Sequence, residues 1–488
     1  MSSIASAPVA EASRPLLRGL QAIVGRDNVL HRLVDLQTYE YDAYVERSVP
    51  RAVVYLQSTA EVSAVVRFLA REGIPFVPRG YGTNVSGGTL ALDGGVVLEM
   101  GRMNKILEID LPNQRVVVQP GIFNLDVSDI LSPHGYYYAP DPASQKASSL
   151  GGNIAENASG PHCFKYGVTS NYVLGLEVVL PDGEVVRMGG KSLDLPGLDL
   201  TGVFVGSEGT LGIATSATLR ILKKPETVKT MLGVFASVED AGNVVSAIVA
   251  AGLVPATLEM MDHLTVNAVE DAMACGFPRE AGAVLMIELD GLSDGMGEIA
   301  EQVATISRAN GALDVRVAKD EAEREALWRG RRGAFAAVTR LAPSYLSMDG
   351  TVPRTKLPEA LRRVAEIGRH YGFQISCVLH AGDGNLHPLA LFDDRDESLR
   401  RNAEAASLDI LHMCVELGGT VSGEHGIGIE KLEAMHFVFD DNDLRAQALV
   451  KEAFDPQGLS NPGKVLPDPF AGAAIDERSV RSEAAVDV

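Results

Sequence analysis

Cysteine is scarce in this chain, and its few cysteines cannot form a cluster. The four of them, Cys163, Cys275, Cys377 and Cys414, lie far apart and show no CxxC spacing. A disulfide framework, a zinc knuckle or an iron–sulfur cluster needs closely spaced cysteines. The sequence therefore argues against these sites within the chain and predicts a reducing, cytoplasmic compartment.

The chain also lacks basic clusters and long apolar runs. Asp and Glu outnumber Lys and Arg by 64 to 43, which gives a formal net charge of −21. Nucleic-acid binding needs clustered basic residues, so we expect no nucleic-acid partner. The most apolar stretch, 244–254, is too short to span a bilayer and is followed by Pro255. Residues 1–15 lack the basic start and apolar run of a signal peptide, so we expect neither a membrane span nor a leader.

Length and apolar content are sufficient for more than one domain. The 488 residues are 46% hydrophobic and 22% charged, as expected of a globular protein with at least two cores. The polar, proline-containing connector at 223–226 is the best candidate boundary. We expect a disordered N-terminus at 1–14, a first domain at 15–225, a second domain at 226–467 and a flexible tail at 468–488.

Hydrophobic periodicity predicts an α+β protein whose two halves differ. The first half alternates short elements, with strands at 52–56, 75–78, 95–100, 106–110, 115–119, 174–180, 184–188 and 212–222 and a helix at 59–72. The second half has strands at 231–236, 257–261, 284–290, 313–317, 345–348, 375–380 and 388–392, and its clearest helices are 357–371 and 397–417. We expect this half to be an antiparallel sheet covered by helices.

Three glycine-rich segments stand out in the first half. RGYGTNVSGG (79–88) follows a strand but has Val85 where a dinucleotide fingerprint needs its third glycine. Taken alone, it fits an ordinary turn as well as an anion-binding loop. DPASQKASSLGGNIAENASGPHCFKYG (141–167) and GVFVGSEGTLGIATSATLRI (202–221) add two more segments of small residues. Three such segments in one domain predict one long ligand lined by backbone.

The segment HAGDGNLH (380–387) carries two histidines on either side of an Asp-Gly pair. Asp383-Gly384 is typical of a two-residue type I′ turn, which would pair His380 with His387 and project both rings to one face. Two imidazoles there could share a metal ion. GGTVSGEHGIG (418–428) offers Glu424 as a third ligand, beside His425. From the residues alone, a hairpin with structural histidines explains the segment as well.

Together PRGYGTNVSGG, DPASQKASSLGGNIAENASG and GSEGTLGI resemble the FAD-binding domain of the vanillyl-alcohol oxidase-like (PCMH-type) flavoproteins, over residues 15–225. The resemblance implies FAD in a groove between two α/β subdomains. The implied contacts are Arg79, Gly80, Gly82, Thr83, Asn84, Ser86 and Gly87 for the pyrophosphate, Pro142, Ser148, Ser149, Gly152, Asn157 and Gly160 for the ribityl–isoalloxazine region, and Glu208, Gly209 and Ile213 for the adenine half. Covalently flavinylated relatives carry a histidine in the first loop. Because Thr83, Asn84 and Val85 stand there, we expect non-covalent FAD.

HAGDGNLHPLALF, GGTVSGEHGIGIEK and AFDPQGLSNPGK, with ALWRGRRGAFAAV and SMDGTVPR, resemble the C-terminal domain of the FAD-linked 2-hydroxy-acid dehydrogenases. This group includes bacterial glycolate oxidases, D-lactate dehydrogenases and D-2-hydroxyglutarate dehydrogenases. The resemblance implies a divalent metal site, with Zn²⁺, Mn²⁺ or Fe²⁺ as candidates, at His380, His387 and Glu424. It also implies His425 as proton acceptor, Arg331 as the carboxylate-binding arginine, with Arg329 and Arg332 as neighbours that compete for that role, and Asn461 as a further cofactor contact.

The resemblance also narrows the substrate. Enzymes for D-2-hydroxyglutarate carry a lysine and an asparagine where this chain has Ser347 and Leu389. This chain thus lacks two polar groups that suit the distal carboxylate of a larger substrate, which favours a small 2-hydroxy acid as its substrate. Glycolate is the first candidate, and D-lactate is the alternative. A non-redox flavoprotein of the alkylglycerone-phosphate synthase kind and a non-catalytic FAD-binding subunit fit the histidine and arginine set less well.

Similarity to the FAD subunits of bacterial glycolate oxidases implies partners for electron transfer. Since the chain has no cysteine cluster of its own, reduced flavin must pass electrons to an acceptor or to a partner subunit, and the resemblance implies one that bears iron–sulfur clusters. A homodimer and peripheral attachment to the inner membrane through partners are left open by the sequence.

Overall fold

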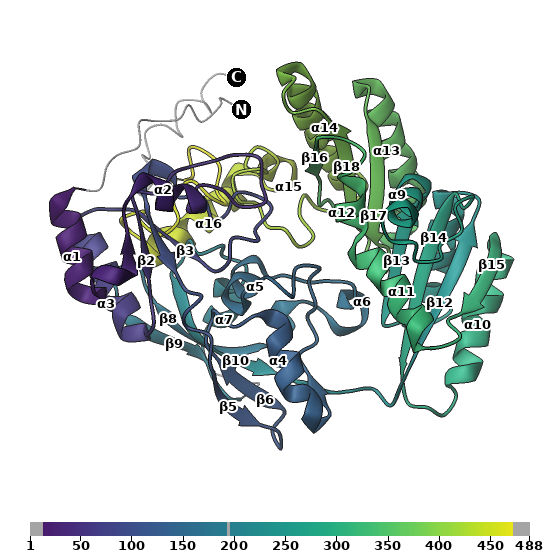
Figure 1. Ribbon diagram of the computed structural model, residues 1–488, viewed down its shortest axis with the longest axis horizontal. Helices are drawn as coiled ribbons and strands as arrows, with labels where there is room; N and C mark the ends of the chain where they lie inside the picture. The colour runs from purple at the N-terminus through teal and green to yellow at the C-terminus, as the bar shows by residue number, and fades with distance from the viewer. Residues whose placement is uncertain (1–12, 193–195, 472–488) are drawn as a thin grey trace.

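The computed structural model describes residues 13–192 and 196–471, which form two halves joined by a short connector (Figure 1). Of the expected disordered N-terminus, residues 1–12 lie outside the described residues, whereas Arg14 begins a helix capped by Ser13, which the sequence did not predict. The expected tail lies outside them from residue 472 on. No helix among the described residues is long and apolar enough to cross a membrane.

The first half contains two sheets. The first sheet has the order β1-β2-β4-β3, with β2, β3 and β4 parallel, and the second has the antiparallel order β5-β6-β10-β8-β9. The strands are β1 (Val29–Leu30), β2 (Ala52–Tyr55), β3 (Phe76–Arg79), β4 (Val96–Glu99), β5 (Ile106–Asp110), β6 (Arg115–Val118), β8 (Val173–Val179), β9 (Val185–Gly189) and β10 (Ile213–Arg220), with β7 (Tyr136–Tyr137) and β11 (Leu222–Lys223) as a separate pair. The helices are α1 (Arg14–Val24), α2 (Leu33–Leu36), α3 (Thr59–Arg71), α4 (Asn124–Leu131), α5 (Leu150–Glu156), α6 (Cys163–Tyr166) and α7 (Leu200–Phe204).

Helix α3 illustrates how the sequence determines where a helix of this half begins and which of its faces is buried. Ser58 caps its N-terminus by accepting a hydrogen bond from the N–H of Glu61 at 3.2 Å. Its apolar residues recur at helical spacing, so Val62, Val65, Val66 and Leu69 are fully buried against the first sheet. Burying each such side chain stabilises the fold by roughly 1.5–3 kcal/mol.

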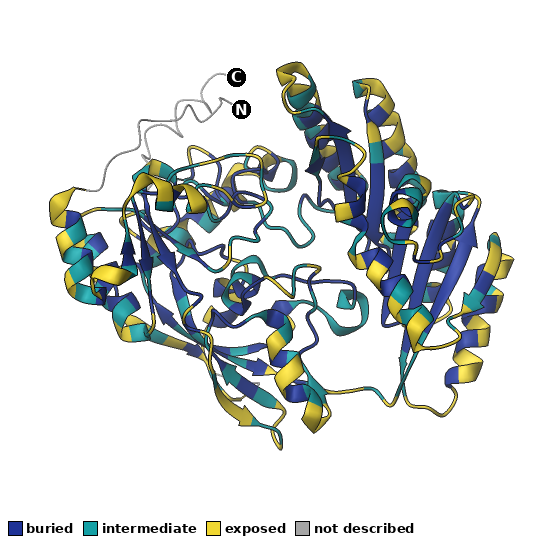
Figure 2. Ribbon diagram, in the orientation of Figure 1, coloured by how far each residue is buried: buried dark blue, intermediate teal, exposed yellow. Residues whose placement is uncertain are grey.

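The second half is one seven-stranded antiparallel sheet with the order β15-β12-β14-β13-β17-β18-β16. Its strands are β12 (Thr227–Phe235), β13 (Thr257–Asp262), β14 (Ala283–Gly291), β15 (Ala312–Val317), β16 (Ser344–Ser347), β17 (Gln374–His380) and β18 (Asn385–Phe392). Its helices are α8 (Val238–Ala250), α9 (His263–Met273), α10 (Met296–Ala309), α11 (Glu321–Arg332), α12 (Ala334–Val338), α13 (Leu357–Tyr371) and α14 (Glu397–Glu416). The central strands are buried, whereas the edge strand β15 and the outer faces of the helices are exposed (Figure 2).

Helices cover both faces of this sheet. α8, α10, α13 and α14 pack on one face, and α9, α11 and α12 pack on the other. Because side chains alternate along a strand, Leu379 and Leu386 enter the first core, whereas Val378 and Leu389 enter the second. His380 and His387 share the face of Val378 and Leu389, and the expected antiparallel sheet covered by helices is confirmed.

The hairpin that carries the two histidines differs from the predicted one. His380 lies opposite Asn385 and His387 opposite Val378, so four residues, 381–384, connect the strands. The predicted two-residue type I′ turn is wrong, because of these four residues only Gly384 has a positive φ, 84°. Contacts with neighbouring segments set the loop, including the N–H of Val352 bonded to the carbonyl of Gly384 at 3.0 Å. The pairing is shifted by two residues, an even number, so both rings still lie on one face.

The chain finally returns to the first half. After α15 (Met435–Val438) and α16 (Asp441–Phe454), Leu459 joins the core of the first sheet, and its carbonyl accepts the N–H of Phe76 in β3 at 2.9 Å. These C-terminal residues, yellow in Figure 1, lie beside the purple N-terminal elements. In space the first half thus includes residues near 455–466, a return that the predicted division at 225 and 467 did not anticipate, because hydrophobic patterns do not report which sheet a late segment joins.

Candidate active site

The candidate active site is a cavity of about 380 Å³ between the two halves. One wall comes from the glycine-rich loops of the first half, including Gly80–Val85 and Pro142–Gln145, and the other from the second half. A smaller cavity of about 70 Å³ shares Gly80, Thr89, Ser149, Gly152 and Glu156 with it, so the two form one elongated groove. A groove of this shape fits a long ligand that reaches from the first half to the second.

The predicted cofactor residues divide into four groups by location. Gly80, Gly82, Thr83, Asn84, Pro142, Ser149 and Gly152 line the large cavity, and Arg79, Glu208, Gly209 and Ile213 line the small one. Asn461 lines a third cavity beside α16. Ser86, Gly87, Ser148, Asn157 and Gly160 line none of these three cavities, although Ser148 is buried and its hydroxyl has no hydrogen-bond partner among the described residues.

The loop residues suit FAD through backbone rather than side chains. Gly82 has a φ of 70°, and a Cβ on Gly80 would lie 2.0 Å from the hydroxyl of Ser149. Side chains larger than hydrogen are therefore excluded where the backbone turns toward the groove. The Nδ2 atom of the buried Asn84 also has no hydrogen-bond partner within the described part of the chain. These free donors and bare backbone positions are consistent with a bound FAD.

Three predicted cofactor residues use their side chains elsewhere. The guanidinium of Arg79 donates to the carbonyl of Tyr41 at 2.7 Å and to that of Tyr39 at 3.4 Å, so it turns away from the groove. Glu208 accepts the N–H groups of Ile427 at 2.6 Å and Gly428 at 2.8 Å. The side chain of Asn157 accepts the N–H of Ser170 at 2.8 Å. The side chains of these residues are thus engaged with the protein itself, and sequence motifs do not distinguish this role from direct contact with the cofactor.

The structure brings His380, His387 and Glu424 together where β17 ends and β18 begins. Glu424 Oε1 lies 3.3 Å from His380 Nε2 and 3.1 Å from His387 Nε2. The two imidazole rings are perpendicular, with centroids 5.2 Å apart. One ligand atom from each residue lies within 4.8 Å of the others, which is the spacing of a three-ligand metal site.

The far side of each histidine ring is held in the orientation that a metal ligand needs. His380 Nδ1 lies 2.8 Å from Glu259 Oε1, and His387 Nδ1 lies 3.3 Å from the carbonyl of Met348. Each of these partners can hold a proton on Nδ1, so Nε2, which faces Glu424, is the atom of each ring that would ligate an ion once it is deprotonated. Burial alone would raise the pKa of Glu424, but His380 and His387 hold that pKa well below its usual value. The site thus offers two imidazole nitrogens and an ionised carboxylate.

His425 and Arg331 lie at the same cavity. The ring of His425 stacks on that of His387, with centroids 4.9 Å apart, and burial lowers its pKa to about 4. This ring is therefore neutral at pH 7 and able to accept a proton. Arg331 is 3% exposed, forms an ion pair with Glu259 and has no hydrogen-bond partner for its Nε among the described residues. Arg332 also lines the cavity, whereas Arg329 does not line it.

Sequence reasoning missed three residues around this site. Ser159, from the first half, donates to Glu424 Oε2 at 2.8 Å, and Glu259 bridges His380 and Arg331. Asp349 accepts the backbone N–H of His425 at 2.9 Å. The signal for Ser159 was its place in the glycine-rich segment, and the signal for Glu259 was a charged residue inside an apolar strand. Neither signal says which partner the residue meets.

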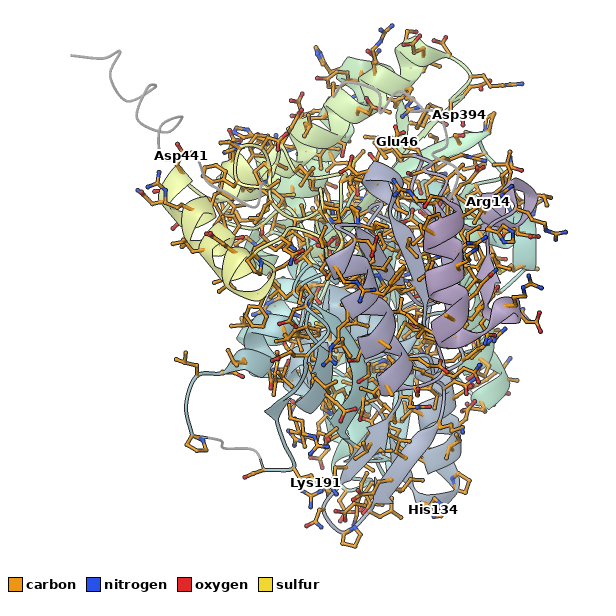
Figure 3. All side chains as sticks on the ribbon, turned by 90° about the vertical axis from the view of Figure 1, so that its left-hand side faces the viewer. Arg14, Glu46, His134, Lys191, Asp394 and Asp441 are labelled. Atoms are coloured by element: carbon orange, nitrogen blue, oxygen red, sulfur yellow. The ribbon has the colours of Figure 1, made fainter. Side chains whose placement is uncertain are left out.

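The two halves also contact each other beside the cavity. His162 Nδ1 lies 2.7 Å from Asp141 Oδ2, and its Nε2 lies 3.4 Å from Glu288 Oε1 of β14. The His162 ring stacks on Trp328 of α11, whose Nε1 donates to Glu288 at 2.7 Å. At the opposite side, Arg400 of α14 forms an ion pair with Glu46, which is labelled in Figure 3. The cavity is therefore closed by polar contacts between the halves.

Comparisons with known proteins agree with this architecture. The "FAD binding domain" family profile matches residues 50–189, and that of "FAD linked oxidases, C-terminal domain" matches residues 224–465. Among solved structures, the 4-ethylphenol oxidase of Gulosibacter chungangensis has a TM-score of 0.78 at 18% identity over 94% of this chain and 99% of that chain. p-Cresol methylhydroxylase also has a TM-score of 0.78 at 18% identity, over 92% of this chain and 96% of that chain. The predicted PCMH-type fold is confirmed.

Curated relatives are much closer in sequence. Glycolate oxidase subunit GlcD of Escherichia coli (strain K12) is 45% identical over 93% of this chain and 91% of its own length, and that of Bacillus subtilis (strain 168) is 41% identical over 90% and 94%. The D-lactate dehydrogenase of Anaerostipes hadrus is 34% identical over 88% and 92%. With the groove, the glycine-rich loops and both family profiles in place, the chain belongs to the FAD-linked oxidases and is an FAD-binding oxidoreductase.

Proposed function

We propose that the protein oxidises a small 2-hydroxy acid, glycolate to glyoxylate, with FAD as the hydride acceptor. The observation that carries the proposal is the meeting of His380, His387, Glu424 and His425 with Arg331 in the cavity that the FAD loops also line. The identity of 45% with a glycolate oxidase subunit supports glycolate as the substrate. When bound without a covalent link, FAD supplies the two-electron redox chemistry.

Each residue has a chemical task in this proposal. Arg331 binds the substrate carboxylate through a charge-assisted hydrogen bond and so fixes which face of the α-carbon meets the flavin. His425, neutral at pH 7, accepts the hydroxyl proton, a contribution of typically ~10²–10⁴-fold to the rate. Arg331 is buried and His425 is largely shielded, which limits the access of water to the reacting atoms.

We also propose a divalent metal at His380, His387 and Glu424. Two imidazole nitrogens and one carboxylate, with room beside them, suit Zn²⁺, Mn²⁺ or Fe²⁺. When bound, such an ion acts as a Lewis acid that lowers the pKa of a coordinated hydroxyl. Glu259 and the carbonyl of Met348 would keep both histidines in the ligating orientation.

D-Lactate is the second candidate substrate. It is favoured by relatives that are D-lactate dehydrogenases, the one from Anaerostipes hadrus at 34% identity. Ser347 lines the cavity, and Leu389 pairs with it on the neighbouring strand, so neither position offers a cation to a distal carboxylate. This pair supports a monocarboxylate but leaves the choice between glycolate and D-lactate to experiment.

Anaerobic reduction of the bound flavin tests the proposal. Glycolate should bleach the ~450 nm flavin band faster than D-lactate at equal concentration, because reduction by substrate needs no further acceptor. His425→Asn should slow bleaching without lowering FAD content, and His134→Asn, an exposed site, is the matched control. Failure of both acids to bleach the band would reject the dehydrogenase reaction. Faster bleaching by D-lactate would reassign the substrate.

Partners for the re-oxidation of the flavin form the last part of the proposal. The relatives named glycolate oxidase subunits belong, by that name, to an assembly. The four cysteines of this chain are far apart and do not form a cluster site. A partner subunit with iron–sulfur clusters would therefore carry the electrons onward. This assembly would lie in the cytoplasm, either attached to the inner membrane or free of it. A non-redox synthase would not need His425 as a base for alcohol oxidation. A non-catalytic subunit would not need Arg331 to bind a substrate carboxylate.

A further inference from the structure

The loop Ser422–Gly426 carries Glu424 and His425, and it is held by hydrogen bonds to one buried aspartate. Asp349, fully buried just after β16, accepts the N–H of His425 at 2.9 Å, the N–H of Glu424 at 3.2 Å and the hydroxyl of Ser422 at 2.7 Å. Its backbone carbonyl accepts the N–H of Gly423 at 2.9 Å. Four consecutive residues of the loop therefore bond to a single residue of a different element.

Lys431 completes this arrangement from the other side. It is fully buried, and its ammonium donates to Asp349 Oδ2 at 3.0 Å, to the carbonyl of Gly426 at 3.1 Å and to the hydroxyl of Ser422 at 3.3 Å. These three contacts use all three N–H donors of the ammonium. An unpaired buried ammonium would cost several kcal/mol, so Lys431 and Asp349 depend on each other. Together they bridge both ends of the Ser422–Gly426 loop.

Asp349 has a second geometric interpretation, as a metal ligand with His387 and His425. Its hydrogen bonds argue against this interpretation. Oδ2 already accepts from Ser422, Lys431 and the N–H of His425, and Oδ1 accepts the N–H of Glu424, so both oxygens are engaged in hydrogen bonds with the protein. Glu424, in contrast, receives one side-chain hydrogen bond, from Ser159, and points its other oxygen at both histidines.

We propose that Asp349 and Lys431 are positioning residues, which hold the Ser422–Gly426 loop so that Glu424 faces His380 and His387 while His425 stays stacked on His387. The inference rests on the proposed function, because it assigns the pair to the metal and proton-accepting groups of that site. Neither residue lines the cavity, so their effect passes through the loop.

Zn²⁺ affinity of the FAD-loaded enzyme tests the pair. Asp349→Asn removes the charge and keeps the shape, and it should weaken Zn²⁺ binding by roughly 10–100-fold, as is typical for residues that orient metal ligands. Ser422→Ala removes the hydroxyl that donates to Asp349 and accepts from Lys431 and from the N–H of Gly426, and it should weaken Zn²⁺ binding by roughly tenfold. Competition with a chromophoric chelator gives the affinity. FAD content and the thermal midpoint report on folding.

Two matched substitutions control for burial. Asp262→Asn alters another carboxylate that accepts two backbone N–H groups, those of Thr265 and Cys377, each at 2.9 Å. Ser63→Ala removes a buried hydroxyl that donates to the carbonyl of Gly183 at 2.6 Å. Both controls should keep the wild-type Zn²⁺ affinity. If Asp349→Asn fails to fold, the milder Ser422→Ala against Ser63→Ala still decides the question.

The possible results separate the inference from the proposed function. Weaker Zn²⁺ binding in the loop variants, with FAD content unchanged and controls normal, supports the positioning role. Wild-type affinity in Asp349→Asn and Ser422→Ala overturns that role and leaves the proposed function standing. Absence of Zn²⁺ binding by the wild-type enzyme overturns both the inference and the metal site. Flavin bleaching by glycolate in that case would still support the oxidation itself.

Discussion

At the scale of single residues, the site depends on a few buried polar side chains. His380, His387, Glu424 and His425 were found from two motifs, because histidine and glutamate in glycine-rich sequence are chemically conspicuous. Ser159 and Glu259 were not found, since a hydroxyl or a carboxylate acquires its role only from the partner that folding supplies. Sequence could therefore predict the candidate catalytic and metal-binding residues better than the residues that contact and orient them.

Ser159 gives the sharpest prediction at this scale. Ser159→Ala removes the hydrogen bond to Glu424, a bond of 2.8 Å between the two halves, and should weaken Zn²⁺ binding by roughly tenfold. FAD content should stay unchanged, because the hydroxyl points to the second half. Thr210, whose hydroxyl donates to the carbonyl of Ser207 at 2.7 Å, offers a control in Thr210→Val. Equal Zn²⁺ affinities for the two variants would contradict the role of Ser159.

At the scale of elements, strands and helices followed from periodicity, whereas connections did not. Helix α13 has the predicted ends at 357 and 371, because an apolar stripe, Pro358 near its start and Gly372 at its end all agree. The predicted two-residue turn of the hairpin at 380–387 is wrong, because neighbouring segments rather than the Asp-Gly pair determine the conformation of its loop. Turn rules describe an isolated hairpin, and this one is surrounded by Val352 and Leu258.

A pair of glycine variants tests that explanation. A Cβ on Gly384 would lie 2.0 Å from the carbonyl oxygen of Val352, whereas a Cβ on Gly372 would meet nothing within 4 Å. Both have positive φ, 84° and 81°, so Ala costs about 1–3 kcal/mol of backbone strain at either position. Gly384→Ala should lower the urea midpoint further than Gly372→Ala and should also weaken Zn²⁺ binding. Equal midpoints and equal Zn²⁺ affinities would show that the Val352 contact does not set the loop.

At the scale of the whole molecule, the relation between the halves could not be predicted from patterns. The contacts that join the halves beside the cavity, such as that of His162 with Glu288, link residues far apart in sequence. Burial alone would raise the pKa of Glu288, but His162 and Arg324 lower it to about 2. Burial alone would lower the pKa of His162, but Asp141 and Glu288 raise it well above its usual value. The interface is therefore sensitive to pH in two directions.

The signs of these shifts give a stability window. Because the folded pKa of Glu288 is below its usual 4.5, its contribution is present above pH 4.5 and is lost as the pH falls toward 2. Because the folded pKa of His162 is above its usual 6.5, its contribution is present below pH 6.5 and is lost as the pH rises through the folded value. The contact between the halves should therefore be strongest between pH 4.5 and 6.5.

Glu288→Gln tests the acid side of this window. The wild type should lose up to roughly 3 kcal/mol more stability than the variant between pH 4.5 and 2, in proportion to the shift in pKa. Urea midpoints measured at half-unit steps of pH give the comparison. Glu325→Gln, at an exposed position of α11, should parallel the wild type. If the urea midpoints of Glu288→Gln and the wild type changed in parallel with pH, Glu288 would not contribute to the loss of stability in acid.

The return of the C-terminal residues to the first half has a consequence for biosynthesis. Asn461 donates to the carbonyls of Gly88 at 2.9 Å and Glu208 at 2.7 Å, and Lys464 donates to that of Leu90 at 2.9 Å. These residues leave the ribosome after every strand of the second half has been made. The first half is thus synthesised before the second half but completed after it, when Asn461 bonds to Gly88 and Glu208, two residues that line the cofactor groove.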